Sequence, residues 1–138
     1  MNVDVNPYLS FNGKCEAAFK FYQQCLGGQE LSFHKYAGSP MENEVPAEWR
    51  DRVMHATLLC GKTALMGADT PPQYYREVQG FSVSVNVDKT EDAERVFNAL
   101  AQGGKIQMPI QQTFWAARFG MLIDKFGIPW MVNCNQQP

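Results

Sequence analysis

The feature that most constrains this fold is an internal repeat of one pattern of helix and strands. Shifting the chain by about 75 residues superposes its two halves, and a repeat of this length indicates a supersecondary unit used twice. The matched helix positions are Ala18 with Ala93, Phe21 with Val96, Tyr22 with Phe97, Cys25 with Leu100 and Gly28 with Gly103. Because few of these residues are identical, the shared order of elements carries the argument. Each half reads as strand, helix, strand, strand, strand, which predicts two βαβββ modules.

The two expected helices show apolar residues at helical spacing. The first stripe consists of Cys15, Ala18, Phe19, Tyr22, Cys25 and Leu26, and the second of Ala93, Val96, Phe97, Leu100 and Ala101. Asn12 is a candidate N-cap for the first helix, and Asp88 with Glu91 forms a capping-box pattern before the second. Glycine pairs follow both stripes, and glycine favours helix ends because it accepts the left-handed conformation.

Strands are expected at residues 7–11, 30–36, 53–60, 63–67, 81–87, 105–111, 117–123 and 128–133. Residues 81–87 alternate strictly between apolar and polar, as a half-buried strand should. Gly61-Lys62 predicts a hairpin turn, and residues 124–127 predict a turn before the last strand. Residues 37–51 form a long loop, which could be a lid over a site or an arm that contacts a second copy.

The length of 138 residues predicts one domain, residues 1–138, with module one at about 1–70 and module two at about 80–138. A hydrophobic fraction of 45% with 19% charged residues argues against disorder. With a net charge of −2 and scattered basic residues, the chain has no basic cluster of the kind that binds nucleic acid. No apolar run approaches the roughly 20 residues of a membrane span, and the N-terminus lacks signal-peptide features, so no membrane partner is expected.

The four cysteines point to a reducing compartment. They are Cys15, Cys25, Cys60 and Cys134, and no two of them form a CxxC pair. Their spacing suits neither a zinc site nor a small disulfide scaffold. We therefore expect reduced thiols in a cytoplasmic protein.

Three stretches carry a resemblance to a known family. They are PYLSFNG at residues 7–13 followed by AFKFY at 18–22, FWAARFG at 114–120, and DKFGIPWMVN at 124–133. With them, the chain resembles the PhnB-like branch of the vicinal-oxygen-chelate superfamily of glyoxalases, bleomycin-resistance proteins and dioxygenases, over essentially its whole length. The resemblance implies an α+β fold of two tandem βαβββ modules, each a curled mixed sheet that forms a half-barrel with its helix packed outside. It also implies a homodimer whose modules enclose a ligand cavity.

The family's metal site does not carry over to this chain. Metal-dependent members bind a divalent ion through His, Gln or Glu on the first and last strands of each module. Aligned on the first helix, these positions fall on Pro7, Ser82, Leu65 or Met66, and Met131. Such side chains ligate hard or borderline divalent ions poorly. We expect no metal and no cofactor; an unusual site that combines His55 with carboxylates stays open.

Arg118 and the aromatic residues beside it are candidates for a binding site. Arg118 could clamp a carboxylate or phosphonate, or it could pair with an acid or stack on Trp115. Phe114, Trp115 and Trp130 could line a cavity, since pockets are mostly apolar with a few polar groups, or they could belong to the core.

Further candidates lie on the expected strands. Ser82, Ser84 and Asn86 share one strand face, which could line a cavity or face solvent. Met66 and Met131, with Met108, could line the cavity or fill the core. His55 could be a general base or a hydrogen-bonded structural histidine, and His34 is expected to face solvent.

No motif for nucleophilic catalysis or phosphate binding is present, neither GxSxG, nor a P-loop, nor GxGxxG. Some PhnB-like chains have been likened to ubiquinone methyltransferases, but both glycine pairs here follow helices, whereas a nucleotide-binding turn follows a strand. We therefore predict a protein that binds a small organic ligand without a metal. If Arg118 takes part in the site, the ligand is anionic. The alternatives are a metal-dependent lyase, isomerase or dioxygenase, and an interaction module whose dimer surface is its function.

Overall fold

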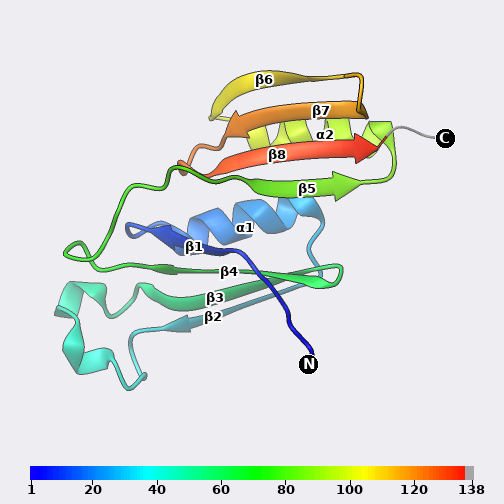
Figure 1. Ribbon diagram of the computed structural model, residues 1–138. Helices are drawn as coiled ribbons and strands as arrows, with labels where there is room; N and C mark the ends of the chain where they lie inside the picture. Colours follow the sequence, from blue (N-terminus) through cyan, green and yellow to red (C-terminus); the bar gives the residue numbers. More distant parts are fainter. Residues whose placement is uncertain (136–138) are drawn as a thin grey trace. The chain divides into compact units, whose positions relative to one another are not determined.

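The computed structural model describes residues 1–135, and the chain divides into two compact units, Met1–Glu77 and Val78–Pro138. We call them module one and module two and describe each by itself (Figure 1). Module one contains β1 (Tyr8–Phe11), α1 (Cys15–Leu26), β2 (Glu30–Lys35), the 3-10 turns η1 (Glu42–Glu44) and η2 (Ala47–Trp49), β3 (Val53–Cys60) and β4 (Thr63–Asp69). Module two contains β5 (Val83–Val87), α2 (Thr90–Ala101), β6 (Lys105–Gln111), β7 (Ala116–Ile123) and β8 (Pro129–Asn135). Both modules thus have the predicted βαβββ order.

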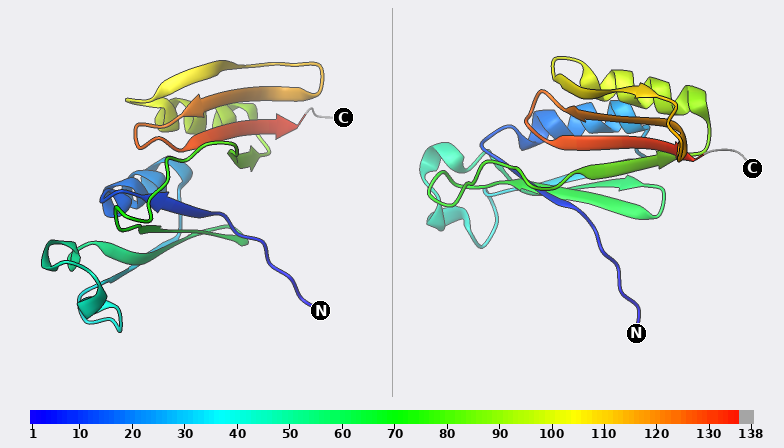
Figure 2. Two further views of the ribbon diagram at one scale, coloured as in Figure 1. Left: turned by 60° about the vertical axis from the view of Figure 1, so that its left-hand side comes forward. Right: turned by 45° about the horizontal axis from the view of Figure 1, so that its top comes forward.

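The two sheets have the same topology. Their strand orders are β1-β4-β3-β2 and β5-β8-β7-β6. In each sheet the first pair is parallel and the other pairs are antiparallel, so both sheets are mixed. One helix covers one face of each sheet, and neither sheet closes into a barrel (Figure 2). The predicted fold class, α+β with two tandem glyoxalase-like modules, is confirmed.

Each helix packs closely on its sheet because a glycine lies beneath a helix phenylalanine. A Cβ atom on Gly67 would lie 2.8 Å from Cε1 of Phe19 and 2.7 Å from the backbone oxygen of Leu9. A Cβ atom on Gly120 would lie 2.6 Å from Cε2 of Phe97. Such distances are too short for real carbon contacts, so these two strand positions require the residue without a side chain.

The helix starts differ from the sequence-based prediction. α1 follows Lys14, which makes no side-chain cap; instead Oδ1 of Asp69 accepts a hydrogen bond of 3.0 Å from the backbone N–H of Cys15. α2 follows Lys89, which also makes no side-chain cap. The N-cap position of α2 is therefore Lys89, one residue after Asp88, where the sequence predicted it.

The strand boundaries shift by one or two residues. β4 continues to Asp69, beyond the predicted end at residue 67, and so brings that carboxylate beneath α1. β5 begins at Val83, so Ser82 precedes the strand in which it was predicted.

The long loop after β2 packs around a small apolar cluster of its own, made of Tyr36, Val45, Trp49 and Met54. The rings of Tyr36 and Trp49 meet edge to face with centroids 6.3 Å apart. The hydroxyl of Tyr36 donates a 2.8 Å hydrogen bond to the backbone oxygen of Asp69. These contacts tie the loop to β4. Across residues 1–135, no helix is long and apolar enough to cross a membrane.

Candidate functional site

Each sheet has one face that its own helix leaves uncovered, which we call the open face. Residues paired across neighbouring strands point to the same side, so the strand register defines which side chains share it. In module one, one row across the open face runs through Tyr8, Met66, Thr57 and Ser32. His34 and His55 form a neighbouring cross-strand pair on the same face. This face therefore gathers hydroxyl and imidazole groups.

Three of these side chains are joined in a chain of contacts. The Tyr8 hydroxyl lies 3.3 Å from Nδ1 of His55, and Nε2 of His55 lies 3.0 Å from the Thr57 hydroxyl. The rings of Tyr8 and His55 are also in contact, with centroids 5.7 Å apart. Tyr8 is 50% exposed, whereas His55 and Thr57 are half-buried behind it. Partial burial raises the pKa of Tyr8, with the Cys15 thiol adding to the effect, so its phenol stays protonated.

The open face of module two carries a ladder of amides. The side-chain amide of Asn133 donates to Oδ1 of Asn86 at 3.3 Å and to Oδ1 of Asn135 at 3.0 Å. The Asn86 amide reaches the Ser84 hydroxyl at 3.5 Å. Amides carry both donors and acceptors, so this ladder can bind either kind of polar group.

Aromatic and thioether side chains continue the same face. Phe119 pairs with Asn133, and the ring of Trp115 packs against Phe119 with centroids 5.5 Å apart. The ring of Phe114 also packs against that of Trp115, with centroids 4.7 Å apart. The next row across the sheet is Ser84, Met131, Met121 and Met108. Trp115 is 49% exposed and Phe114 89% exposed, so both rings offer apolar surface to a ligand or partner.

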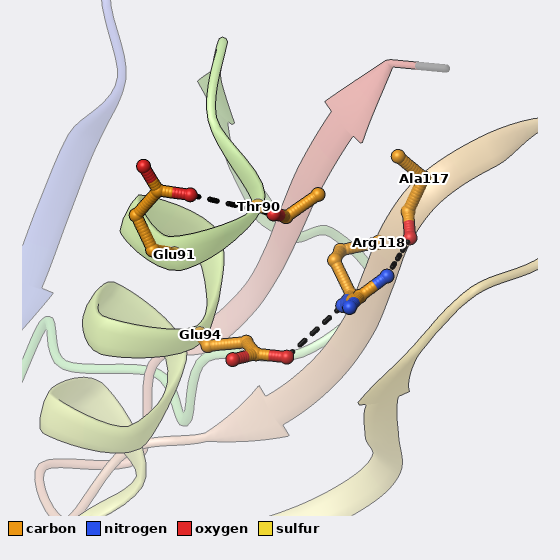
Figure 3. A network of polar contacts seen from close by, with 5 residues as sticks. All are labelled: Thr90, Glu91, Glu94, Ala117 and Arg118. Atoms are coloured by element: carbon orange, nitrogen blue, oxygen red, sulfur yellow. Dashed lines mark hydrogen bonds and ion pairs between the residues drawn. The ribbon is translucent and has the colours of Figure 1, made fainter. Parts of the chain in front are cut away.

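Arg118 does not join these residues. It lies in the row of β7 that pairs with the buried Cys134, and its Nε donates a 3.0 Å hydrogen bond to Oε1 of Glu94 on α2 (Figure 3). Its Nη1 donates to the backbone oxygen of Ala117 at 2.7 Å. The guanidinium thus pairs with an acid on the helix side, which is the structural alternative that the sequence left open.

Trp130 and Ser82 also lie apart from the open-face cluster. Trp130 is 1% exposed, and its Nε1 donates a 2.8 Å hydrogen bond to Oδ2 of Asp124. Asp124, itself buried, also accepts backbone hydrogen bonds from Phe126 and Ile128, which holds the turn before β8. Trp130 is therefore a core residue in this structure. Ser82 stands just outside β5 and makes no part of the amide ladder.

The register also changes which positions match between modules. Tyr8 pairs with Met66, and Ser84 pairs with Met131, each on the open face. The first strands of the two modules are therefore related by a shift that is one residue longer than the shift that relates the helices. The reason is that the connection from β5 to α2 is one residue shorter than that from β1 to α1. Pro7 and Ser82, which the helix alignment equated, are not structurally equivalent, and Leu65 is buried on the helix side.

These positions do not fit the family's metal. The corrected set is a phenol, a hydroxyl and two thioethers, from Tyr8, Ser84, Met66 and Met131. Thioethers prefer soft ions, and neutral hydroxyl groups alone bind divalent ions weakly. Within residues 1–135, no three His, Cys, Asp or Glu side chains gather closely enough to hold a metal ion.

Several residues of the open faces were missed by the sequence reasoning. Tyr8, Thr57, Phe119 and Asn133 were not singled out. Period-two alternation places Tyr8 opposite to the buried Leu9, and Thr57 on the same side as His55, so a signal existed for the face. The contact between Tyr8 and His55 depends on a parallel pairing with β4 that short motifs do not specify.

Two βαβββ units of identical strand order define a glyoxalase-like fold. The chain belongs to the Glyoxalase/Bleomycin resistance protein/Dioxygenase superfamily, whose family model matches residues 5–132. Protein YjdN of Escherichia coli (strain K12) is 36% identical over 143 aligned residues, covering 97% of both chains.

Solved structures agree with this assignment. The crystal structure of protein PA1353 from Pseudomonas aeruginosa has a TM-score of 0.89 and 50% identity, covering 99% of this chain and 100% of the other. A PhnB protein from Bacillus cereus, named as a candidate 3-demethylubiquinone-9 3-methyltransferase, has a TM-score of 0.73 and 26% identity, covering 96% and 99%. The resemblance to the PhnB-like branch is confirmed.

Proposed function

We propose that this protein binds a small organic molecule on the open face of module two without a bound metal. The observation that carries the proposal is the contiguity of the Trp115–Phe119 aromatic pair with the amide ladder at Asn86 and Asn133. Ligand sites combine apolar surface with a few placed polar groups, and this face has both.

The ligand chemistry follows from these groups. Trp115 offers a flat ring surface, and an aromatic partner ring contributes about 0.5–1.5 kcal/mol beyond the area it buries. The amides recognise carbonyl, hydroxyl or amide groups without needing charge. A neutral ligand with one flat apolar part therefore suits this face best. An anionic ligand has less support, because Glu94 already pairs with Arg118.

We also propose that the protein is a cytoplasmic homodimer. Its apolar surface supports a second copy, since Phe81, Ile106 and Phe114 are all exposed in module two. The outer strands β2 and β6 each have one unpaired edge, and unpaired edges favour association. None of the four cysteines takes part in a disulfide, which suits a reducing compartment.

We do not extend the methyltransferase name of the Bacillus cereus protein to this chain. Gly27 ends α1 in the left-handed conformation, and Gly103 follows α2 in the same conformation. These glycines therefore serve as helix ends, and neither lies in a strand-to-helix turn that could hold a nucleotide cofactor.

A thermal-shift screen in chelator tests the proposal. Neutral aromatic amides, lactones and phenols would be compared with aliphatic carboxylates and phosphonates. A true ligand at a hundredfold excess over its dissociation constant should stabilise the protein by about 2.7 kcal/mol. Asn133→Ala and Trp115→Ala should each weaken binding at least about tenfold, the loss of roughly 1.4 kcal/mol that one good contact supplies.

Ile106→Ala is the matched control, because Ile106 is exposed on the same sheet but pairs with the buried Leu122 rather than with open-face residues. The control should bind like the unmodified protein. If no compound stabilises the protein, or if Asn133→Ala and Trp115→Ala bind as tightly as the control, the open face of module two is not the site.

A further inference from the structure

Module one contains a series of hydrogen-bonded polar side chains that has no part in the ligand binding proposed for module two. Tyr8, His55 and Thr57 come from β1 and β3, far apart in the sequence, and meet on one open face. Within this chain of contacts the exposure falls inward, since Tyr8 is 50% exposed and the other two residues are half-buried. A substrate on this face would therefore meet the phenol first, with the imidazole behind it.

We propose that Tyr8, His55 and Thr57 form a metal-independent general-base relay for a small carbon acid, a compound with an acidic C–H bond beside a carbonyl or similar group. The ring of His55 keeps its proton on Nε2 and donates it to the Thr57 hydroxyl 3.0 Å away. Nδ1 is then the acceptor for the Tyr8 hydroxyl, 3.3 Å away. This one tautomer satisfies both hydrogen bonds of the His55 ring.

The proton moves in two linked steps. The phenol oxygen of Tyr8 takes the proton from the substrate carbon while its own proton passes to Nδ1 of His55. The C–H electron pair stays with the substrate as a carbanion or enolate, or expels a leaving group. Tyr8 ends neutral and His55 ends as an imidazolium, which later returns the proton to the product or to water.

The relay explains how a tyrosine with a raised pKa could act as a base. Burial disfavours the phenolate of Tyr8, so a free phenolate is scarce at neutral pH. In the relay the phenolate never accumulates, because the negative charge is cancelled as it forms. Thr57 is a positioning residue, since it fixes the imidazole tautomer without touching the substrate.

The opposite histidine is an internal control. His34 pairs with His55 across β2 and β3, lies on the same face and is exposed. Unlike His55, it makes no hydrogen bond or ring contact with a tyrosine or threonine within residues 1–135. General-base activity that needs the relay must therefore depend on His55 and not on His34.

The test uses 5-nitrobenzisoxazole as a probe carbon acid in the presence of chelator. A base removes its C–H proton, the electron pair forms a C≡N bond, and the N–O bond breaks to release a coloured 2-cyano-4-nitrophenolate. General-base catalysis typically contributes 10²–10⁴-fold, so His55→Gln and Tyr8→Phe should each reduce the rate at least about tenfold. His34→Gln should keep the rate, and Thr57→Ser should keep the activity that Thr57→Val loses.

Three outcomes would overturn the relay. The first is a rate no higher than that of an unrelated protein of equal histidine content. The second is equal activity of His55→Gln and His34→Gln, and the third is full activity of Tyr8→Phe. Circular dichroism of each variant excludes misfolding as the cause of a loss. The relay uses residues of module one alone, and Asp51→Ala, which removes an exposed carboxylate of the same module, should leave the rate unchanged.

Discussion

Replacing the buried Asp69 should destabilise module one more than any exposed charge does. Asp69 is 2% exposed, and its two carboxylate oxygens accept backbone hydrogen bonds of 3.0 Å from Cys15 and Val53. One of these closes the first turn of α1, and the other holds the start of β3. A buried donor left without a partner costs about 1–3 kcal/mol, so Asp69→Ala should lose roughly 2–6 kcal/mol of unfolding free energy.

Asp69→Asn should lose about half as much, roughly 1–3 kcal/mol, because its amide keeps one acceptor oxygen and turns a donor toward the other N–H. Asp51→Ala is the control, since Asp51 is exposed and should change stability by less than about 0.5 kcal/mol. Urea unfolding followed by circular dichroism gives the free energies. A loss below about 1 kcal/mol for Asp69→Ala would refute the reasoning that this carboxylate ties helix and strand together.

Three further predictions follow from the site and its surroundings. Burial raises the pKa of the Cys15 thiol, with the nearby Asp69 and Glu16 carboxylates adding to the effect. Because the folded state holds this proton more tightly than the unfolded chain, the stabilisation is fully present below the unfolded pKa of about 8.5 and is lost as pH rises above it. Urea unfolding at stepped pH should show this decline, and Cys15→Ala should flatten it; an equal slope in the variant would argue against Cys15. Arg118→Gln should leave ligand binding unchanged in the thermal-shift assay and cost at most about 1 kcal/mol, since its ion pair with Glu94 is partly exposed; a tenfold loss of binding would return Arg118 to the site. Elemental analysis of protein purified without chelator, and again after soaking in zinc, nickel, manganese and ferrous ions, should find no stoichiometric metal. A stoichiometric ion that chelator removes would favour the alternative hypothesis of a metal-dependent lyase, isomerase or dioxygenase.

Much of the fold could be predicted because its signals are local. Apolar spacing placed both helices, and Gly27 ended α1 as expected. Alternation located β5, and a turn with Asp first and Gly fourth located the connection to β8. The shift of about 75 residues aligns the helices of the two modules correctly but misaligns their first strands by one residue. The strand and helix patterns of the sequence do not reveal this, because the connection between them can lose a residue without changing either pattern.

The site was harder to predict because it depends on register and on partners distant in the chain. The role of Asp69 could not be predicted, because its carboxylate accepts hydrogen bonds from residues that lie 54 and 16 positions away in the sequence. Arg118 looked like an anion clamp beside Trp115, yet the strand directs it toward Glu94 on α2. Residue type alone does not show that Trp130 is buried and Trp115 is exposed. The side of the sheet on which each ring lies, and the hydrogen bond from Trp130 to Asp124, make that distinction.

The most direct test of ligand binding by module two is nuclear magnetic resonance of the labelled protein, titrated in chelator with a compound that stabilises it. The proposal predicts that the amide and indole signals that move first belong to Ser84, Asn86, Trp115 and Asn133. Shifts confined to Arg118 and Glu94, or shifts that appear only when a divalent metal is added, would contradict it.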